Sequence, residues 1–108
     1  MQVPALRIGN LVAEFPLIQG GMGVGISMAN LAAAVANCGG IGVISGVETG
    51  FYRRDYLRNK RRANLEALVE QIKKAREQSP RGTLGVNIMV AINNFEETVR
   101  EAVRAGID

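Results

Sequence analysis

The chain has 108 residues, of which 47% are hydrophobic and 21% charged, with a formal net charge of +3. This composition is that of one folded domain at most, and it excludes a disordered chain. The sequence has no histidine and a single cysteine. An intrachain disulfide is therefore excluded, and the most common general base and metal ligand is missing.

No run of about 18 apolar residues is present, so the sequence predicts no membrane-spanning helix. The first ten residues, MQVPALRIGN, lack the basic start and apolar block of a signal peptide. A lone cysteine suits a reducing compartment. We therefore expect a cytoplasmic protein that does not bind membranes.

The predicted elements begin with a β-hairpin over residues 5–14. Gly9-Asn10 lies there between apolar residues and suits a two-residue turn. A buried strand is predicted over Phe15–Gln19, with Pro16 near its start, where a missing N–H is tolerated.

A helix is predicted next, with Ser27 as its N-cap. Its apolar residues recur at helical spacing and predict one buried stripe, formed by Met28, Leu31, Ala32 and Val35. Cys38 falls on the apolar stripe of this helix, and without a histidine to activate it we expect it to pack in the core rather than act as a nucleophile.

The later elements repeat this order. The sequence predicts a strand over Gly40–Ser45, a helix over Ala63–Gln78 and a strand over Thr83–Val90. Asn94 and Glu97 form a capping-box pattern ahead of a third helix. No group of candidate metal ligands is found, and the carboxylates at helix starts suit capping and solubility.

Three strand–helix units therefore follow the hairpin, over residues 15–39, 40–82 and 83–106. Apolar strands that alternate with amphipathic helices predict an α/β fold with a parallel sheet. The sheet could stay open and doubly wound or belong to a (β/α)₈ barrel, which needs about 250 residues. Ile107-Asp108 resembles the start of a further strand, so we expect residues 1–108 to be the amino-terminal part of a longer domain.

The stretch FPLIQGGMGVGIS, residues 15–27, places four glycines directly after the first strand of this pattern. The dinucleotide fingerprint G-x-G-x-x-G fails because Ile26 takes the place of its last glycine, and no P-loop motif is present. Two interpretations stay open. Glycines at the carboxyl end of a strand let the main chain approach a flat flavin ring, or they form a tight strand–helix turn.

Three motifs in order resemble the nitronate monooxygenase family, also named 2-nitropropane dioxygenases. They are PLIQGGMGVGIS, LAAAVANCGGIGVIS and GVNIMV, and the resemblance spans Leu6 to Asp108. The related FMN-dependent enoyl-acyl-carrier-protein reductases of bacteria are similar as well. The resemblance implies a TIM barrel that binds FMN, with this chain as its (β/α)₃ amino-terminal portion.

Site residues follow from the resemblance position by position. Gly21, Met22 and Gly23 match the family's FMN contact after the first strand, and Asn87 matches a polar contact at the third. Met89, two positions after Asn87, is expected to point in the same direction as Asn87 from that strand. Ser45-Gly46 should lie nearby.

The implied activity is oxidation of an alkyl nitronate with dioxygen to a carbonyl compound and nitrite. An enoyl-acyl-carrier-protein reductase that uses NAD(P)H is the alternative enzyme, and a non-catalytic truncated half-barrel or assembly module is the alternative of another class. Whether the protein forms a homo-oligomer stays open. The family's catalytic histidine lies beyond residue 108, so we expect no catalytic residue in this chain, weak FMN binding and no turnover by these residues alone.

A basic insertion occupies residues 47–62 and carries six basic residues between Arg53 and Arg62. Basic residues mixed with aromatic ones can indicate nucleic-acid binding. A solvated loop or lid is the interpretation that we favour over nucleic acid, and a role on the substrate side stays open.

Overall fold

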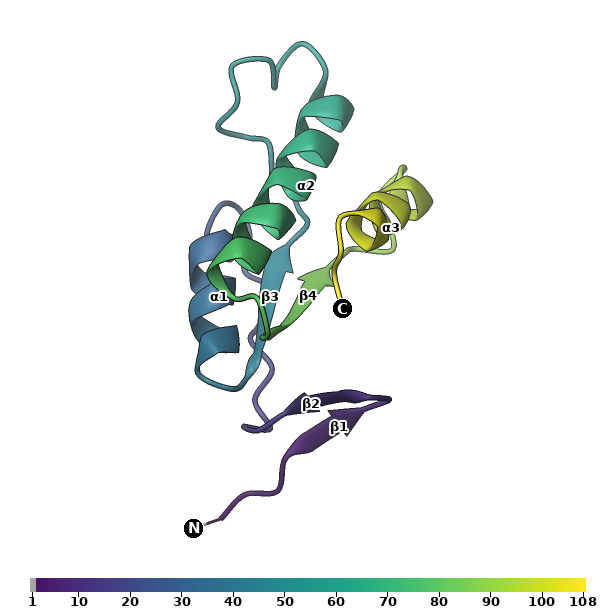
Figure 1. Ribbon diagram of the computed structural model, residues 1–108. Coiled ribbons are helices and arrows are strands. Elements are labelled where there is room, and N and C mark those ends of the chain that lie inside the picture. Colours follow the sequence, from purple (N-terminus) through teal and green to yellow (C-terminus); the bar gives the residue numbers. More distant parts are fainter. Residues whose placement is uncertain (1) are drawn as a thin grey trace.

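The structure, a computed structural model, describes residues 2–108. Its elements in order are β1 (Leu6–Ile8), β2 (Leu11–Ala13), α1 (Ala29–Asn37), β3 (Ile41–Ser45), α2 (Lys60–Gln78), β4 (Thr83–Asn87) and α3 (Phe95–Arg104). β1 and β2 pair antiparallel, whereas β3 and β4 pair in parallel (Figure 1). The predicted α/β class is confirmed, with two small sheets and three helices.

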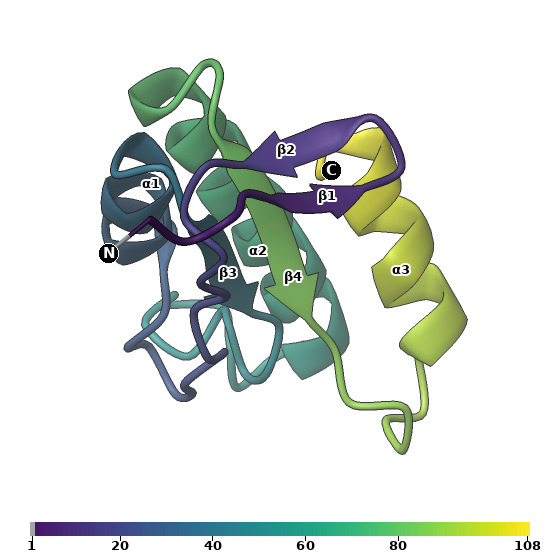
Figure 2. The ribbon, with the colours of Figure 1, turned by 90° about the horizontal axis from the view of Figure 1, so that it is seen from below.

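The predicted hairpin is confirmed at β1 and β2. Ile8 pairs with Leu11 across a two-residue turn, in which Gly9 has a φ of +60° that favours glycine. Figure 2 shows the hairpin on the near side when the molecule is seen from below. Ala13 packs against Ile41 and Val43 of β3, so the hairpin covers part of one face of the parallel sheet.

The three helices cover the opposite face of that sheet. Alternate residues of a strand point to opposite faces. Ile44 and Leu84 therefore pack with Leu68 and Ile72 in the larger core, which also includes residues of α1 and α3. Figure 1 shows α1 and α2 in front of β3. The hairpin packs on the face that carries Ile41.

α1 packs on β3 through its alanines, and the predicted stripe is confirmed only at Ala32. Its buried residues are Ala29, Ala32, Ala33 and Ala36, whereas Leu31 is 38% exposed. A Cβ on Gly42 would come within 1.9 Å of the carbonyl oxygen of Ala32. Helix and strand thus approach so closely that only small residues fit between them. Cys38 is exposed rather than in the core, because it follows the last turn of α1.

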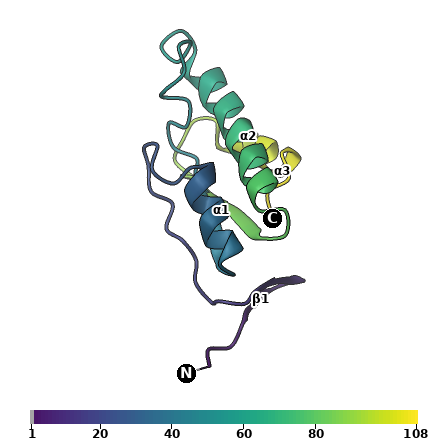
Figure 3. The ribbon, with the colours of Figure 1, turned by 60° about the vertical axis from the view of Figure 1, so that its left-hand side comes forward.

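The first predicted strand, Phe15–Gln19, is reduced to a single bridge between Ile18 and Ile41. The N–H of Ile41 donates to Leu17 (2.8 Å), and the N–H of Gln19 donates to Ile41 (3.0 Å). The segment therefore lies parallel to β3, as expected. No described residue pairs with its other edge, so a full strand does not form. Figure 3 shows this part of the chain rising past α1 before it turns back into the helix.

α2 begins at Lys60, one turn earlier than the predicted Ala63. The side chain of Asn59 accepts a hydrogen bond from the N–H of Arg62 at 3.1 Å. This N-cap satisfies one of the free N–H groups of the first turn. The basic stretch that the sequence reading assigned to a loop therefore supplies the first turn of the helix.

β4 ends at Asn87 and not at the predicted Val90. α3 follows Asn94, as predicted, but the Asn94 side chain makes no capping hydrogen bond. Glu97, the other half of the expected capping box, instead bonds Arg61 of α2 at 2.6 Å. A long-range ion pair between Arg61 and Glu97 thus takes the place of the expected capping hydrogen bonds, and it joins α2 to α3.

The chain returns to the free edge of β4 after α3. The N–H of Asp108 donates to Leu84 at 3.1 Å, and its carboxylate accepts from the N–H of Leu84 at 3.0 Å. Arg76 of α2 donates to the same carboxylate at 2.6 Å. The segment before α1, β3 and β4 are therefore parallel neighbours in chain order, and Asp108 lies beside β4.

Candidate functional site

The last residues of β3 and β4 lie side by side. Ser45 pairs with Asn87 in the parallel register, and the N–H of Gly46 donates to the carbonyl of Asn87 at 2.9 Å. The glycine-rich loop, residues 20–25, follows the segment that lies beside β3. The carboxyl ends of three neighbouring parallel segments therefore meet at one edge, where α/β folds bind their ligands.

Two glycines of the loop bring its main chain onto these strand ends. A Cβ on Gly21 would lie 2.4 Å from the Cβ of Asn87, and one on Gly23 would lie 2.2 Å from Cγ1 of Val47. Such distances are too short for any side chain. Positions 21 and 23 therefore require glycine, because the loop main chain packs directly on Asn87 and Val47 there. A Cβ on Gly20 would meet no atom within 4 Å.

Gly21 and Asn87, which the sequence reading placed in one site, are thus in contact. Asn87 is exposed, so its carboxamide is accessible to a ligand next to the Gly21 peptide. Ser45 is buried beneath the loop, and its Oγ would be 3.1 Å from a Cβ on Gly23. The expectation that Ser45-Gly46 lies near the loop is confirmed.

The two methionines differ in how the structure places them. Met22 is 45% exposed. Its N–H donates to the Ser27 hydroxyl at 3.1 Å, and its carbonyl accepts from the N–H of Ser27 at 2.9 Å. The main chain of Met22 is therefore engaged within the loop, and its side chain is the part that is free to contact a ligand.

Met89 is 53% exposed and lies beyond the end of β4. The expected alternation along a strand therefore does not reach this residue, and its contact with a cofactor stays a prediction.

Ser27 and Gln19 hydrogen-bond next to the glycine-rich loop, an arrangement that the sequence analysis did not predict. Ser27 was predicted to cap α1, but the helix begins at Ala29 and Met28 holds the N-cap position without a side-chain bond. Gln19 Nε2 donates to the Ser27 hydroxyl at 2.8 Å. A glutamine and a serine that flank a glycine run in an otherwise apolar stretch were the available signal.

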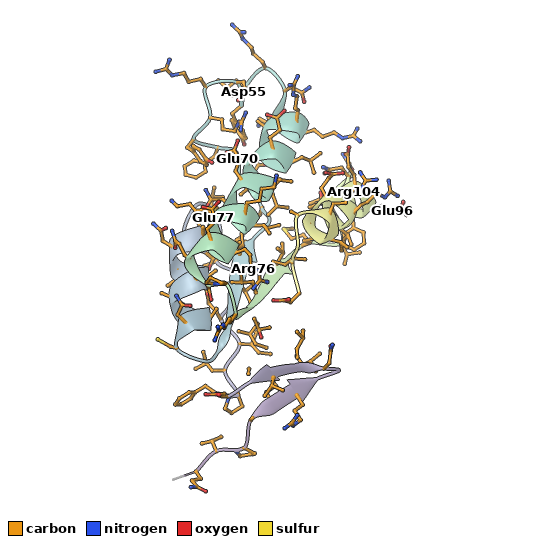
Figure 4. The ribbon with its side chains drawn as sticks, in the orientation of Figure 1. Asp55, Glu70, Arg76, Glu77, Glu96 and Arg104 are labelled. Carbon is orange, nitrogen blue, oxygen red and sulfur yellow. The ribbon has the colours of Figure 1, made fainter. Side chains whose placement is uncertain are left out.

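The basic insertion is tied to α2 by its own ion pairs. The guanidinium of Arg53 contacts Asp55 (3.1 Å), Glu66 (2.7 Å) and Glu70 (2.9 Å). In Figure 4, Asp55 lies in the loop above Glu70 of α2. The hydroxyl of Tyr56 also donates to Glu48. Part of the positive charge is thus neutralised within the insertion, which favours a folded surface loop over a nucleic-acid site.

These contacts predict a pH effect at Asp55. The hydrogen bond from Arg53 lowers the pKa of this carboxyl group below its usual value, which is about 3.9 in an unfolded chain. Ionised Asp55 therefore favours the folded loop. Its contribution is complete above the unfolded pKa and is lost as the pH falls through the lower, folded pKa.

An NMR titration of the Asp55 carboxyl carbon should give a midpoint below about 3.9. The Arg53→Ala variant should move this midpoint back up, and Lys74→Ala on the exposed face of α2 should leave it in place. A midpoint that Arg53→Ala does not raise would contradict the assignment.

The remaining chemistry of the described residues is limited. Nowhere in residues 2–108 do three or more cysteine, aspartate or glutamate side chains gather as metal ligands. None of the helices in this part of the chain is both long and apolar enough to cross a membrane. What distinguishes the strand-end edge is therefore bare main chain beside an exposed carboxamide.

Comparison with known proteins identifies the family. Residues 6–107 match the profile of the family described as nitronate monooxygenase. None of the curated proteins compared with the chain matches it. The profile covers the hairpin and all three strand–helix units, including the glycine-rich loop and Asn87. The chain therefore belongs to the nitronate monooxygenase family, whose members are oxidoreductases and typically use a flavin.

Proposed function

We propose that this chain supplies part of the FMN site of an oxidoreductase that oxidises alkyl nitronates with dioxygen, yielding a carbonyl compound and nitrite. One observation carries the proposal. Gly21 lies against Asn87 at the carboxyl edge of the parallel sheet. Bare main chain and an exposed carboxamide are thus held together in a member of a flavin-using family.

The residues at this edge fit an isoalloxazine ring. Such a ring has flat apolar faces and an edge of nitrogen and oxygen atoms, whose hydrogen bonds tune its reactivity. An asparagine carboxamide both donates and accepts, so it suits that edge. The exposed thioether of Met22 suits a ring face. FMN would supply the transfer of electrons from the nitronate to dioxygen.

The chain's own residues then have distinct tasks. The peptides of Gly21 and Gly23 would approach the ring, since neither residue carries a Cβ. Asn87 would hold the polar edge of the ring, and Met22 would exclude water from one face. Met89 would extend this apolar contact from the loop after β4.

We further propose that these units form the first part of a (β/α)₈ barrel. The parallel neighbours follow in chain order, and the three helices lie on one face, as a barrel requires. The segment before α1 also keeps large apolar side chains exposed, namely Phe15, Leu17 and Ile18. Phe15 and Leu17 line an apolar groove beside α1. Further strands and helices of a barrel would cover this segment.

The test uses the full-length polypeptide purified without added cofactor. We expect a yellow protein with flavin absorption bands, FMN as the released chromophore, and nitrite on addition of propane-2-nitronate. A colourless protein that self-associates and takes up no FMN would contradict the proposal and favour a non-catalytic assembly module.

A crevice favours one second candidate, an enoyl-thioester reductase that takes hydride from NAD(P)H. It has a volume of about 580 Å³, adjoins Gly46 and Val47, and is also lined by Lys60, Arg61 and Asn64. Lys60 and the amide of Asn64 suit a phosphate-bearing nicotinamide or carrier group. Glu48 also lines the crevice, and Arg61 is paired with Glu97. Consumption of NADPH with an enoyl thioester, without nitrite release from a nitronate, would identify this activity instead.

A further inference from the structure

The hydroxyl group of Ser27 lies at the centre of the glycine-rich loop. Ser27 is 0% exposed. Its Oγ accepts hydrogen bonds from Gln19 Nε2 (2.8 Å) and from the N–H of Met22 (3.1 Å), and it donates to the carbonyl of Gly20 (3.1 Å). A serine hydroxyl has one proton and two lone pairs, so every hydrogen-bonding position of this group is filled by Gln19 and by the main chain of the loop.

Ser27 and Gln19 also connect the loop to β3 through hydrogen bonds. The carbonyl of Ser27 accepts from the N–H of Ser45 at 2.8 Å. Oε1 of Gln19 accepts from the N–H of Val43 at 3.0 Å. Ser27 and Gln19 therefore act as a bridge between the loop and the strand whose end lies beside Asn87.

This bridge fixes the peptide groups on both sides of Gly21. The carbonyl of Gly20 and both main-chain groups of Met22 are bonded to Ser27. Gly21 has no side chain to restrain it, yet it has fixed neighbours and rests against Asn87. The position of its peptide relative to that carboxamide is thus set by a buried side chain that bonds only groups of its own chain.

We propose that Ser27 is a positioning residue of the flavin site, with Gln19 as its partner. Its hydroxyl holds the main chain of residues 20–22 at the distance from Asn87 that an FMN ring requires. This inference rests on the proposed function. It assigns to Ser27 no contact with FMN and no part in electron transfer.

The test compares Ser27→Ala with Ser79→Ala in the full-length polypeptide. Ser79 is also 0% exposed, but its hydroxyl has no hydrogen-bond partner, so its removal is a matched control for losing a buried hydroxyl. FMN is titrated into each apoprotein, and quenching of flavin fluorescence gives the Kd. We expect Ser27→Ala to raise the Kd at least about tenfold and to shift the visible flavin bands, whereas Ser79→Ala matches the unmodified protein.

Hydrogen exchange of the apoproteins supplies a readout that needs no flavin. We expect the amides of residues 20–25 to exchange faster in Ser27→Ala than in Ser79→Ala, with the amides of β3 and α2 unchanged. If Ser27→Ala does not fold, Ser27→Cys replaces it, because a thiol leaves no cavity, is only somewhat larger than the hydroxyl and hydrogen-bonds weakly. Its Kd should also exceed that of the unmodified protein.

The outcomes separate the two proposals. A folded Ser27→Ala or Ser27→Cys that binds FMN like the unmodified protein, with unchanged loop exchange, overturns the role of Ser27 and leaves the flavin site intact. Failure of the unmodified protein to bind FMN removes the proposed function, and the positioning role is then overturned with it.

Discussion

Replacing Gly42 with alanine is expected to destabilise the fold by about 3 kcal/mol or more, near the upper end for overpacked cores. The added Cβ would lie 1.9 Å from the carbonyl oxygen of Ala32 and 2.6 Å from its carbonyl carbon. Both are backbone atoms of α1, so no side-chain rotation relieves the overlap. α1 must move away from β3, and a small domain has only about 5–15 kcal/mol of stability in total.

Gly85→Ala is the matched control for this substitution. Gly85 lies in the neighbouring strand, and a Cβ there would meet Cγ2 of Val43 at 3.6 Å, an ordinary contact. Urea unfolding followed by circular dichroism should show a change of less than about 1 kcal/mol for Gly85→Ala. Equal losses in the two variants would mean that the close approach of α1 to Gly42 does not limit the core.

Replacing Gly21 with alanine should have the largest effect on the flavin site. The new Cβ would lie 2.4 Å from the Cβ and 2.9 Å from the Cγ of Asn87. The carboxamide must swing away or the loop must lift, and either change separates the two groups assigned to the ring. We expect the Kd for FMN to rise about 100-fold, which corresponds to ~2.7 kcal/mol and lies within the usual range for overpacking.

A second substitution separates steric effects from ligand binding. Asn87→Gly removes the atoms that the alanine at position 21 would meet, so the steric overlap introduced by Gly21→Ala is absent from the double variant Gly21→Ala/Asn87→Gly. Its FMN affinity should stay low, because the carboxamide is gone. Recovery of full affinity in the double variant would show that Asn87 does not bind the ring.

The order of elements could be predicted from the sequence because its signals are local. A Gly-Asn pair indicates a hairpin turn, and Gly39 and Gly106, which end α1 and α3, have positive φ values of 93° and 95°. The start of α2 and the cap of α3 were predicted wrongly, because the residues there carry signals for more than one local structure. Asn59 caps α2 within a basic stretch that resembled a loop, and Glu97 pairs with Arg61 instead of capping its own helix.

The buried face of α1 could not be predicted in the same way. Hydrophobic periodicity favoured leucine and valine over alanine at the core. The deciding fact is that Gly42, distant in sequence, lets the helix approach β3 through its alanines. A contact of this kind depends on tertiary packing, which periodicity within one helix does not contain.

Asn87 was assigned to the candidate site by the family resemblance and not by sheet topology, and its contact with a flavin stays a prediction. Parallel strands place their carboxyl ends at one edge, which explains why the structure brings Asn87 next to Gly21 of the glycine-rich loop. The role of Ser27 could not be predicted, because a serine before a helix can cap it or bond the preceding loop. Burial of its hydroxyl among Gln19, Gly20 and Met22 decides between these uses.

A crystal structure of the full-length polypeptide with bound FMN is the most direct test of the flavin site. We expect the isoalloxazine ring to lie against the peptides of Gly21 and Gly23, with the carboxamide of Asn87 within about 3 Å of a ring nitrogen or oxygen. A ring bound elsewhere, for example in the crevice beside Lys60, or a carboxamide turned away from it, would contradict the assignment.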